Sequence, residues 1–311
     1  MENKRPLILI SNDDGYQAKG LNCLIDMLRP LADIVVCAPD GPRSGAAASI
    51  TPTVPVCYSK CIVHSECIVH SDSECIVHSA EMHSDTFAAG NPESQQSLCT
   101  MYSSTMHSKD TMHSKDTLHW YSCTGTPVDC VKLACEQVLP RRPDLILSGI
   151  NHGDNASISV HYSGTMGAVY EGCMKGIPSI GVSLYLQRGQ RYEDHPVGAD
   201  TLTAIADLCR RVLQQGLPQD VCLNVNIPTD QPFRGWRVCR QTRGRWTREW
   251  APANNPHGQH AFWMTGTFVD LEPEATDTDF AALRAGYCSI VPITIDATAH
   301  GVMGDLRLII E

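Results

Sequence analysis

The feature that most constrains the fold is a series of short apolar runs that alternate with helical patterns. Five such runs lie at 7–11, 33–38, 144–148, 179–183 and 221–227, and the first of them shows no polar alternation. A strand of this kind is buried on both faces, which is typical of a parallel sheet covered by helices. Strands separated by helical patterns form βαβ units. The sequence therefore predicts an α/β protein with a mostly parallel sheet and helices on both faces.

Three helices are predicted between these strands, at about 21–28, from Thr126 to a residue before Pro140, and at about 165–175. Thr126 is a favoured N-cap and is followed by proline, which is common at the first helical position. From Pro228 onward Arg, Trp, Gly and Pro become frequent, and the runs 262–268 and 287–294 are predicted strands. We expect a core over 1–228 and an appended β-hairpin and tail over 229–311.

The oddest segment is a set of near-identical repeats. Cys-Ile-Val-His-Ser occurs at 61–65, 67–71 and 75–79, and Thr-Met-His-Ser-Lys-Asp occurs at 105–110 and 111–116. Solenoid repeats are longer, roughly 20–45 residues. A thiol-based metal store is the alternative, but the paired spacing of a closed zinc site is absent. We interpret residues 60–116 as a surface insertion that the core does not require.

Composition excludes several classes of function. A formal net charge of −10 argues against binding to a nucleic-acid polymer, which needs clustered Lys and Arg. No run approaches the ~18 apolar residues of a membrane span, so no membrane partner is expected. The first apolar run is too short for a signal-peptide core, which predicts a cytoplasmic protein. The 15 cysteines lie mostly within apolar runs and are expected to be free thiols.

Polar residues follow the predicted strands where a ligand would bind, because open parallel sheets bind ligands at the carboxyl ends of their strands. Asn12-Asp13-Asp14-Gly15 ends the first strand, Ser44 follows the second, and Asn151 follows the strand at 144–148. Adjacent carboxylates repel each other, and a divalent cation such as Mg²⁺ removes that conflict with oxygen ligands. The alternative is a helix-capping Asp beside a turn Asp.

A second candidate site is the helix start at Ser163-Gly164-Thr165. Free backbone N–H groups and the positive end of the helix dipole favour a bound phosphate there. The alternative is that Ser163 is an N-cap and nothing more.

Together these segments resemble the SurE family. The motifs that carry the resemblance occur in the family's order across nearly the whole chain. They are LILISNDDG at 7–15, APDGPRSG at 38–45, CTGTPVDCVKLA at 123–134, SGIN at 148–151, YSGT at 162–165, NVNIP at 224–228, RQTRGRW at 240–246, DTD at 277–279 and GYCSIVP at 286–292.

The resemblance implies a Rossmann-like fold with a C-terminal β-hairpin and a tail used in oligomer formation, as a dimer or tetramer. It also implies hydrolysis of nucleoside 5′- and 3′-monophosphates with one divalent cation per subunit, Mg²⁺ or Mn²⁺; some members also trim short polyphosphate. A non-catalytic nucleotide-binding module is the alternative of a different class.

Matched by motif, the family's functional residues fall on identifiable positions of this chain. Asp13 or Asp14 would orient or deprotonate the attacking water, and Asn12 is an extra phosphate donor. The metal ligands fall on Asp13, Asp14, Ser44 and Asn151, and the phosphate-binding residues on Ser163, Gly164 and Thr165.

Three features depart from the family pattern. The repeats occupy what is normally a short connection, and His152 stands where arginine is common. Gly301 and Gly304 weaken the prediction of a helix at the C-terminal end.

Overall fold

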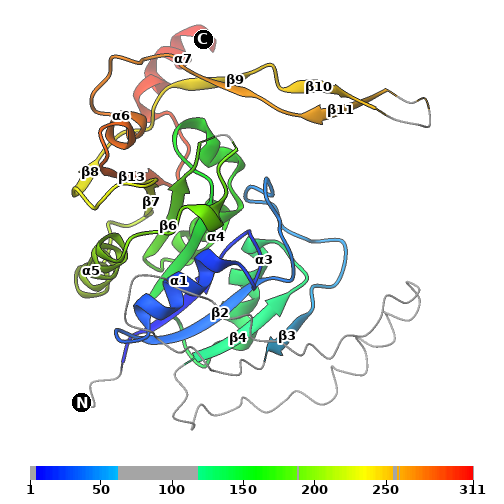
Figure 1. Ribbon diagram of the computed structural model, residues 1–311, viewed down its shortest axis with the longest axis vertical. Helices are drawn as coiled ribbons and strands as arrows, with labels where there is room; N and C mark the ends of the chain where they lie inside the picture. The colour runs from blue at the N-terminus through cyan, green and yellow to red at the C-terminus, as the bar shows by residue number, and fades with distance from the viewer. Residues whose placement is uncertain (1–4, 62–117, 188, 255–257, 259, 311) are drawn as a thin grey trace.

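The structure is a computed structural model that describes residues 5–61, 118–187, 189–254, 258 and 260–310. Its centre is a nine-stranded sheet with the strand order β3-β4-β2-β1-β5-β6-β7-β13-β8 (Figure 1). The strands are β1 Leu7–Ser11, β2 Asp33–Pro39, β3 Tyr58–Cys61, β4 Leu118–Cys123, β5 Leu145–His152, β6 Ser179–Tyr185, β7 Val221–Pro228, β8 Trp236–Val238 and β13 Cys288–Thr294. The six strands from β4 to β7 in this order are parallel, which confirms the predicted mostly parallel sheet.

Helices cover both faces of the sheet, as predicted. Side chains alternate across each strand, so Ile8 and Ile10 of β1 pack with one set of helices while Leu7 and Leu9 pack with the other. The first face is covered by α1 (Lys19–Leu28) and α5 (Ala199–Gln215). The second face is covered by α3 (Pro127–Leu133), which continues as a π-helical turn at Ala134–Val138, and by α4 (Gly164–Met174).

The predicted start of α3 is confirmed in detail. The Thr126 hydroxyl accepts a hydrogen bond from the Asp129 backbone N–H, and the Asp129 carboxylate accepts one from the Thr126 N–H. This reciprocal arrangement satisfies two amide groups that the helix itself leaves unpaired. Helix α5, by contrast, is not among the predicted elements.

The order of the strands reverses between β1 and β5. From β1 the chain moves outward to β2 and then β4, whereas from β5 it moves the other way to β6 and β7. Loops at the carboxyl ends of β1 and β5 therefore diverge to opposite faces of the sheet and leave a crevice between them. Three of the residues singled out above lie here: Asp13 and Asp14 follow β1, and Asn151 lies just before β5 ends at His152.

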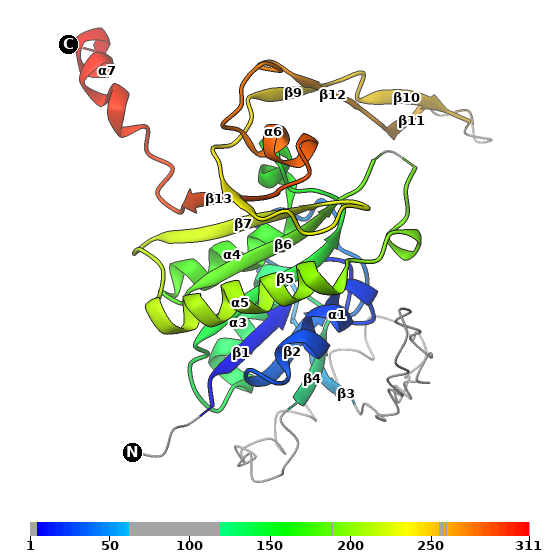
Figure 2. The same ribbon diagram turned by 60° about the vertical axis from the view of Figure 1, so that its left-hand side comes forward.

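The C-terminal part contributes both to the sheet and to an arm. Beyond the predicted boundary at Pro228, β13 pairs antiparallel with β7 and β8 pairs parallel with β13. The arm is a two-stranded ribbon that stands out from the body (Figures 1 and 2). It contains β9 Gly244–Thr247 paired with β12 Thr267–Asp270, and β10 Trp250–Ala253 paired with β11 Ala261–Met264.

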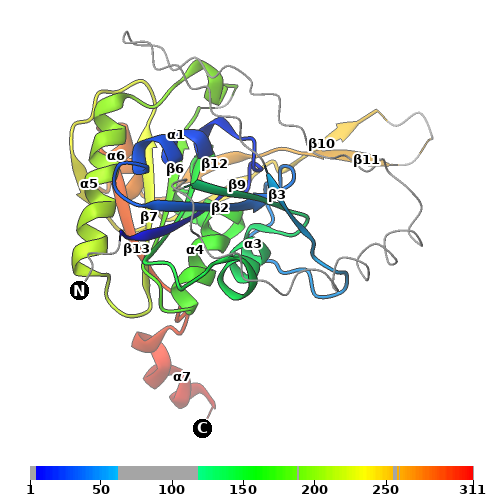
Figure 3. The ribbon, with the colours of Figure 1, turned by 90° about the horizontal axis from the view of Figure 1, so that it is seen from below.

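The arm corrects one prediction and confirms another. The run 262–268 is not a single strand, because the ribbon breaks at Thr265 and Gly266 between β11 and β12. The predicted hairpin extension is present. Two short helices follow it, α6 Asp279–Arg284 and α7 Met303–Ile310. Helix α7 projects from the body (Figure 3), and it forms although Gly304 lies in its first turn and Gly301 just before it.

The repeat-bearing segment 60–116 lies outside the described residues except for Lys60 and Cys61. Cys61 of β3 stands opposite Trp120 of β4 in an antiparallel pair, so the described strands on either side of the segment are neighbours at the sheet edge. The cysteines that the structure describes are free thiols. Among the described helices, none has the length and apolar character needed to cross a membrane.

Candidate functional site

The adjacent aspartates lie in a tight turn at the end of β1. Gly15 has φ +100°, and a Cβ there would lie 3.2 Å from a backbone atom of Gly41. Both constraints favour glycine. The Asn12 side-chain amide donates to the Gly15 carbonyl at 2.9 Å and closes the turn. The sharp bend lets both carboxyl groups face the same edge of the sheet.

Asp13 is held against the start of α4. Its side chain is 4% exposed, and its Oδ1 accepts a hydrogen bond from the Thr165 hydroxyl at 2.5 Å. A Cβ on Gly164 would lie 2.7 Å from the Asp13 Cβ, so only glycine allows this approach. Burial raises the pKa of Asp13 to about 6, the Thr165 hydrogen bond acts in the opposite direction, and the charge of Asp14 raises the pKa further.

Asp14 is fixed from the other side of the crevice. Its Oδ2 accepts a hydrogen bond from the His152 backbone N–H at 3.1 Å. Burial raises the pKa of Asp14 to about 6, and this hydrogen bond acts against the increase. The His152 ring stacks on Tyr192 with 4.0 Å between ring centroids, which holds the end of β5 in place. Burial also lowers the pKa of His152.

The neutral ligands predicted for a metal, Ser44 and Asn151, each lie next in the chain to a residue whose backbone N–H is hydrogen-bonded to one of the aspartates. The Asn151 side-chain nitrogen donates to the Gly153 carbonyl at 2.7 Å, which leaves its amide oxygen as the atom able to bind a cation. Ser44 is exposed in the loop after β2. The preceding residue, Arg43, donates its backbone N–H to the Asp13 carbonyl at 2.7 Å. The loop is thus fixed beside Asp13.

The predicted phosphate-binding residues form the first turn of α4. Ser163 is the N-cap, and its hydroxyl accepts a hydrogen bond from the Met166 backbone N–H at 3.0 Å. The capping interpretation is therefore confirmed, while a role in binding phosphate stays a prediction. Thr165 and Gly164 contact Asp13 directly. The contact between the carboxylate and the helix start joins the two predicted sites into one.

The donor set suits a small, hard cation. Two carboxylates that burial has made difficult to ionise together gain most from a positive charge between them. The Asn12 amide oxygen is buried and has no hydrogen-bond partner among the described residues. No group of three or more His, Cys, Asp or Glu side chains in the described part of the chain is arranged to hold a metal. A cation here would rest on two carboxylates and neutral oxygens, a combination that suits Mg²⁺.

Two interactions at the site were not predicted. The hydrogen bond from His152 to Asp14 arises where the pairing of β5 with β6 shifts register between Ser148 and Asn151. Tyr192 lies in the loop between β6 and α5, and no motif marks it. The sequence singles out His152 only because it stands where arginine is common in the family.

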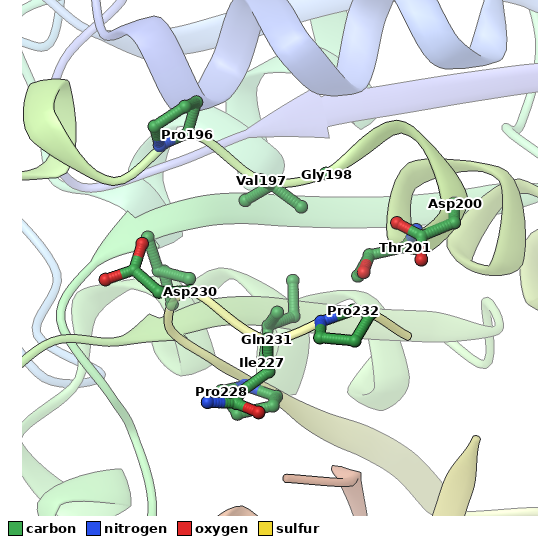
Figure 4. Close-up of a pocket in the computed structure, with 11 residues that line it drawn as sticks. Pro196, Val197, Gly198, Asp200, Thr201, Ile227, Pro228, Asp230, Gln231 and Pro232 are labelled. Carbon is green, nitrogen blue, oxygen red and sulfur yellow. The ribbon is translucent and has the colours of Figure 1, made fainter. Parts of the chain in front are cut away.

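Two cavities lie near this edge of the sheet. One, of about 360 Å³, is lined by Asp14 and His152 and reaches the loops after β2 and β6. The other, of about 300 Å³, lies beyond the same β6–α5 loop and is lined by Pro196, Thr201 and Ile227 among others (Figure 4). None of the predicted site residues lines the second cavity. The first is therefore the one joined to the candidate site.

Comparisons with known proteins agree with this geometry. A family model described as survival protein SurE matches residues 8–248, which is more than half of the chain. The chain belongs to the SurE family. A relative from Phocaeicola vulgatus described as 5′-nucleotidase SurE is 44% identical over 99% of this chain and 98% of that protein. A protein with the same description from Bacteroides fragilis is 42% identical over the same shares.

A solved structure extends the likeness to three dimensions. The crystal structure of the SurE protein from Aquifex aeolicus superposes with a TM-score of 0.67 at 28% sequence identity. The match covers 98% of this chain and 100% of the Aquifex chain. The SurE α/β fold and the family membership are thus shown by sequence and structure together.

Proposed function

We propose that this SurE-family chain is a phosphomonoesterase that hydrolyses nucleoside 5′-monophosphates, and also 3′-monophosphates, to nucleoside and inorganic phosphate. The activity rests on relatives described as 5′-nucleotidases. The observation that carries the proposal to this chain is the pair Asp13 and Asp14 at the strand-order reversal: Asp13 is buried against the start of α4, and Asp14 is hydrogen-bonded to the end of β5. Short polyphosphate is a second substrate class that the proposal includes.

The reaction as proposed needs one divalent cation, Mg²⁺ or Mn²⁺. Asp13, Asp14, Ser44 and Asn151 would hold it, because they supply hard oxygen donors to one crevice. The chemistry that a divalent cation supplies in such a site is Lewis-acid activation of a phosphoryl group and of water. The donor set fits this assignment. His152 Nδ1 lies 3.9 Å from Asp14, but burial lowers the pKa of His152 and so disfavours the charged imidazolium that would neutralise the carboxylate.

The chain's own residues have distinct roles in this proposal. Thr165 fixes the direction of the Asp13 carboxylate, and the His152 N–H fixes that of Asp14. Either aspartate can then orient the attacking water or accept its proton. The start of α4, with Ser163 as its cap, offers backbone N–H groups and a positive dipole to the phosphate oxygens. Asn12 adds a side-chain amide beside them.

We also propose that the protein is a homo-oligomer, a dimer or a tetramer. Large apolar side chains are exposed on the arm and on α7, including Trp263 at 68%, Met264 at 76%, Leu308 at 81% and Ile310 at 83%. Exposed apolar patches of this kind favour association. Light scattering at micromolar concentration tests this directly, and a monomer would contradict it.

The test of the activity is phosphate release from a panel of 5′- and 3′-mononucleotides, p-nitrophenyl phosphate and tripolyphosphate, each with EDTA and with added Mg²⁺ or Mn²⁺. Hydrolysis that EDTA abolishes and metal restores is the expected result. Tight binding of mononucleotides without any hydrolysis would instead favour a non-catalytic nucleotide-binding module.

A further inference from the structure

The cavity beside Asp14 is large enough for more than a phosphate group. Its volume of about 360 Å³ lies within the range usual for small-molecule sites. Asp14 lines it, together with the turn from Gly15 to Lys19. A substrate whose phosphate lies at the aspartates would extend its remaining atoms into this space.

Two loops that line the cavity carry carboxylates on short, anchored segments. Asp40 lies in the loop after β2, where it pairs with Arg43 at 2.8 Å. Glu193 lines the same cavity from the loop between β6 and α5. Its neighbour Tyr192 is 5% exposed and stacks on His152, so the position of Glu193 is tied to the end of β5.

The charges of the lining distinguish between ligands. Its charged residues other than His152 are Asp14, Lys19, Asp40 and Glu193, and three of these four are acidic. Asp40 pairs with Arg43, and Glu193 pairs with Arg191 at 3.5 Å. Among the described lining residues, Lys19 is the one basic residue besides His152 that a second phosphate group would meet. A neutral sugar with vicinal hydroxyls needs no basic partner, and carboxylate oxygens are strong acceptors for hydroxyl donors. A carboxylate that binds ribose hydroxyls is also a known device of nucleotide sites in α/β folds.

We propose that this cavity holds the nucleoside half of the substrate and that Glu193 accepts hydrogen bonds from the ribose hydroxyls. The inference rests on the proposed nucleotidase function and adds the specificity of the same site. It makes Glu193 a specificity-determining residue that selects ribonucleoside monophosphates over substrates that lack the hydroxyls. It also ranks polyphosphate below mononucleotides as a substrate.

The experiment compares kcat/KM for adenosine 5′-monophosphate with that for its 2′,3′-dideoxy analogue. A hydrogen bond to a charged group predicts a wild-type preference for the ribonucleotide of about tenfold or more. In Glu193→Gln that ratio should fall by at least about fivefold, chiefly through KM for the ribonucleotide. Asp194→Asn is the matched control, because Asp194 is the next residue on the same 3-10 turn and does not line the cavity. It should leave the ratio unchanged.

The possible outcomes separate this inference from the function on which it rests. An unchanged ratio in Glu193→Gln, with both substrates hydrolysed, overturns the role of Glu193 alone. No release of phosphate from any substrate, p-nitrophenyl phosphate included, overturns both. Inhibition of p-nitrophenyl phosphate hydrolysis by adenosine and by 2′,3′-dideoxyadenosine gives a second readout. Stronger inhibition by adenosine supports the proposal, and equal inhibition contradicts it.

Discussion

The replacement Asp13→Asn should increase the stability of the metal-free protein at alkaline pH. Burial raises the pKa of Asp13 from 3.8 to about 6 in the folded state. The folded state therefore binds the proton more tightly than the unfolded state, and ionisation of Asp13 destabilises the fold. The penalty is fully present above the folded pKa and is lost as the pH falls toward 3.8. Asparagine has a similar shape and removes the charge.

The magnitude follows from the two pKa values. The difference between the folded and unfolded pKa values of Asp13 lowers the free energy of unfolding by about 3 kcal/mol at pH 8, and by less than ~1 kcal/mol at pH 4. Asparagine keeps one oxygen for the Thr165 hydroxyl, but its nitrogen replaces an acceptor at a buried position, at a cost of about 1 kcal/mol. The net gain expected for Asp13→Asn is about 2 kcal/mol at pH 8, and none at pH 4.

Urea unfolding at the two pH values, in EDTA and in Mg²⁺, measures this effect. Mg²⁺ should stabilise the wild type and have a much smaller effect on Asp13→Asn, because binding to the folded state raises the free energy of unfolding. Asp194→Asn, at an exposed carboxylate, is the control and should change little. A variant that is less stable than wild type at pH 8, or that gains as much from Mg²⁺, would refute the reasoning.

Three further predictions concern the same site and the insertion. Gly164→Ala should lower kcat/KM at least ~100-fold, since the new Cβ meets Asp13 and displaces its carboxylate, while circular dichroism shows an intact fold. The control is Gly301→Ala, whose new Cβ meets nothing within 4 Å and which should keep full activity. Thr165→Val should lower kcat about tenfold or more. Thr165→Ser keeps the hydroxyl and should keep kcat within about threefold of wild type. Equal losses of kcat in both variants would show that the hydroxyl is not needed. Replacing 62–117 by a short Gly/Ser linker should keep activity within about tenfold of wild type. A short linker can join the two strands because Cys61 lies opposite Trp120 across the β3–β4 pair. A folded but inactive product would place the segment in the active site.

The central part of the fold could be predicted because local signals agree with the tertiary structure there. Continuous apolar runs such as Leu7–Ile10 are buried on both faces, and the Thr126 cap begins a helix where its chemistry requires one. Helix α5 also carries a helical period, since Thr201, Ile205, Cys209 and Val212 are buried along one face. It lacks a side-chain cap, and its many polar residues weaken the apolar pattern.

The contacts that build the site could not be predicted from local sequence. Thr165 reaches Asp13 across 152 positions of the chain, and no spacing rule covers such a distance. The N–H of His152 reaches Asp14 just after β5 shifts its register against β6, and such a shift is a property of the backbone that residue types do not reveal. The sequence motifs identify which residues meet, while the packing of β1, β5 and α4 decides how they meet.

The most direct test of a cation-dependent nucleotidase site at Asp13 and Asp14 is a Mn²⁺ titration of activity. Wild type and Asp14→Asn are treated with EDTA, freed of it by gel filtration, and assayed for phosphate release from adenosine 5′-monophosphate as Mn²⁺ is added. We predict no activity in the treated wild type, recovery that rises to saturation as Mn²⁺ is added, and no recovery in Asp14→Asn. Full activity of the treated wild type without metal, or equal recovery in the variant, would contradict the proposed site.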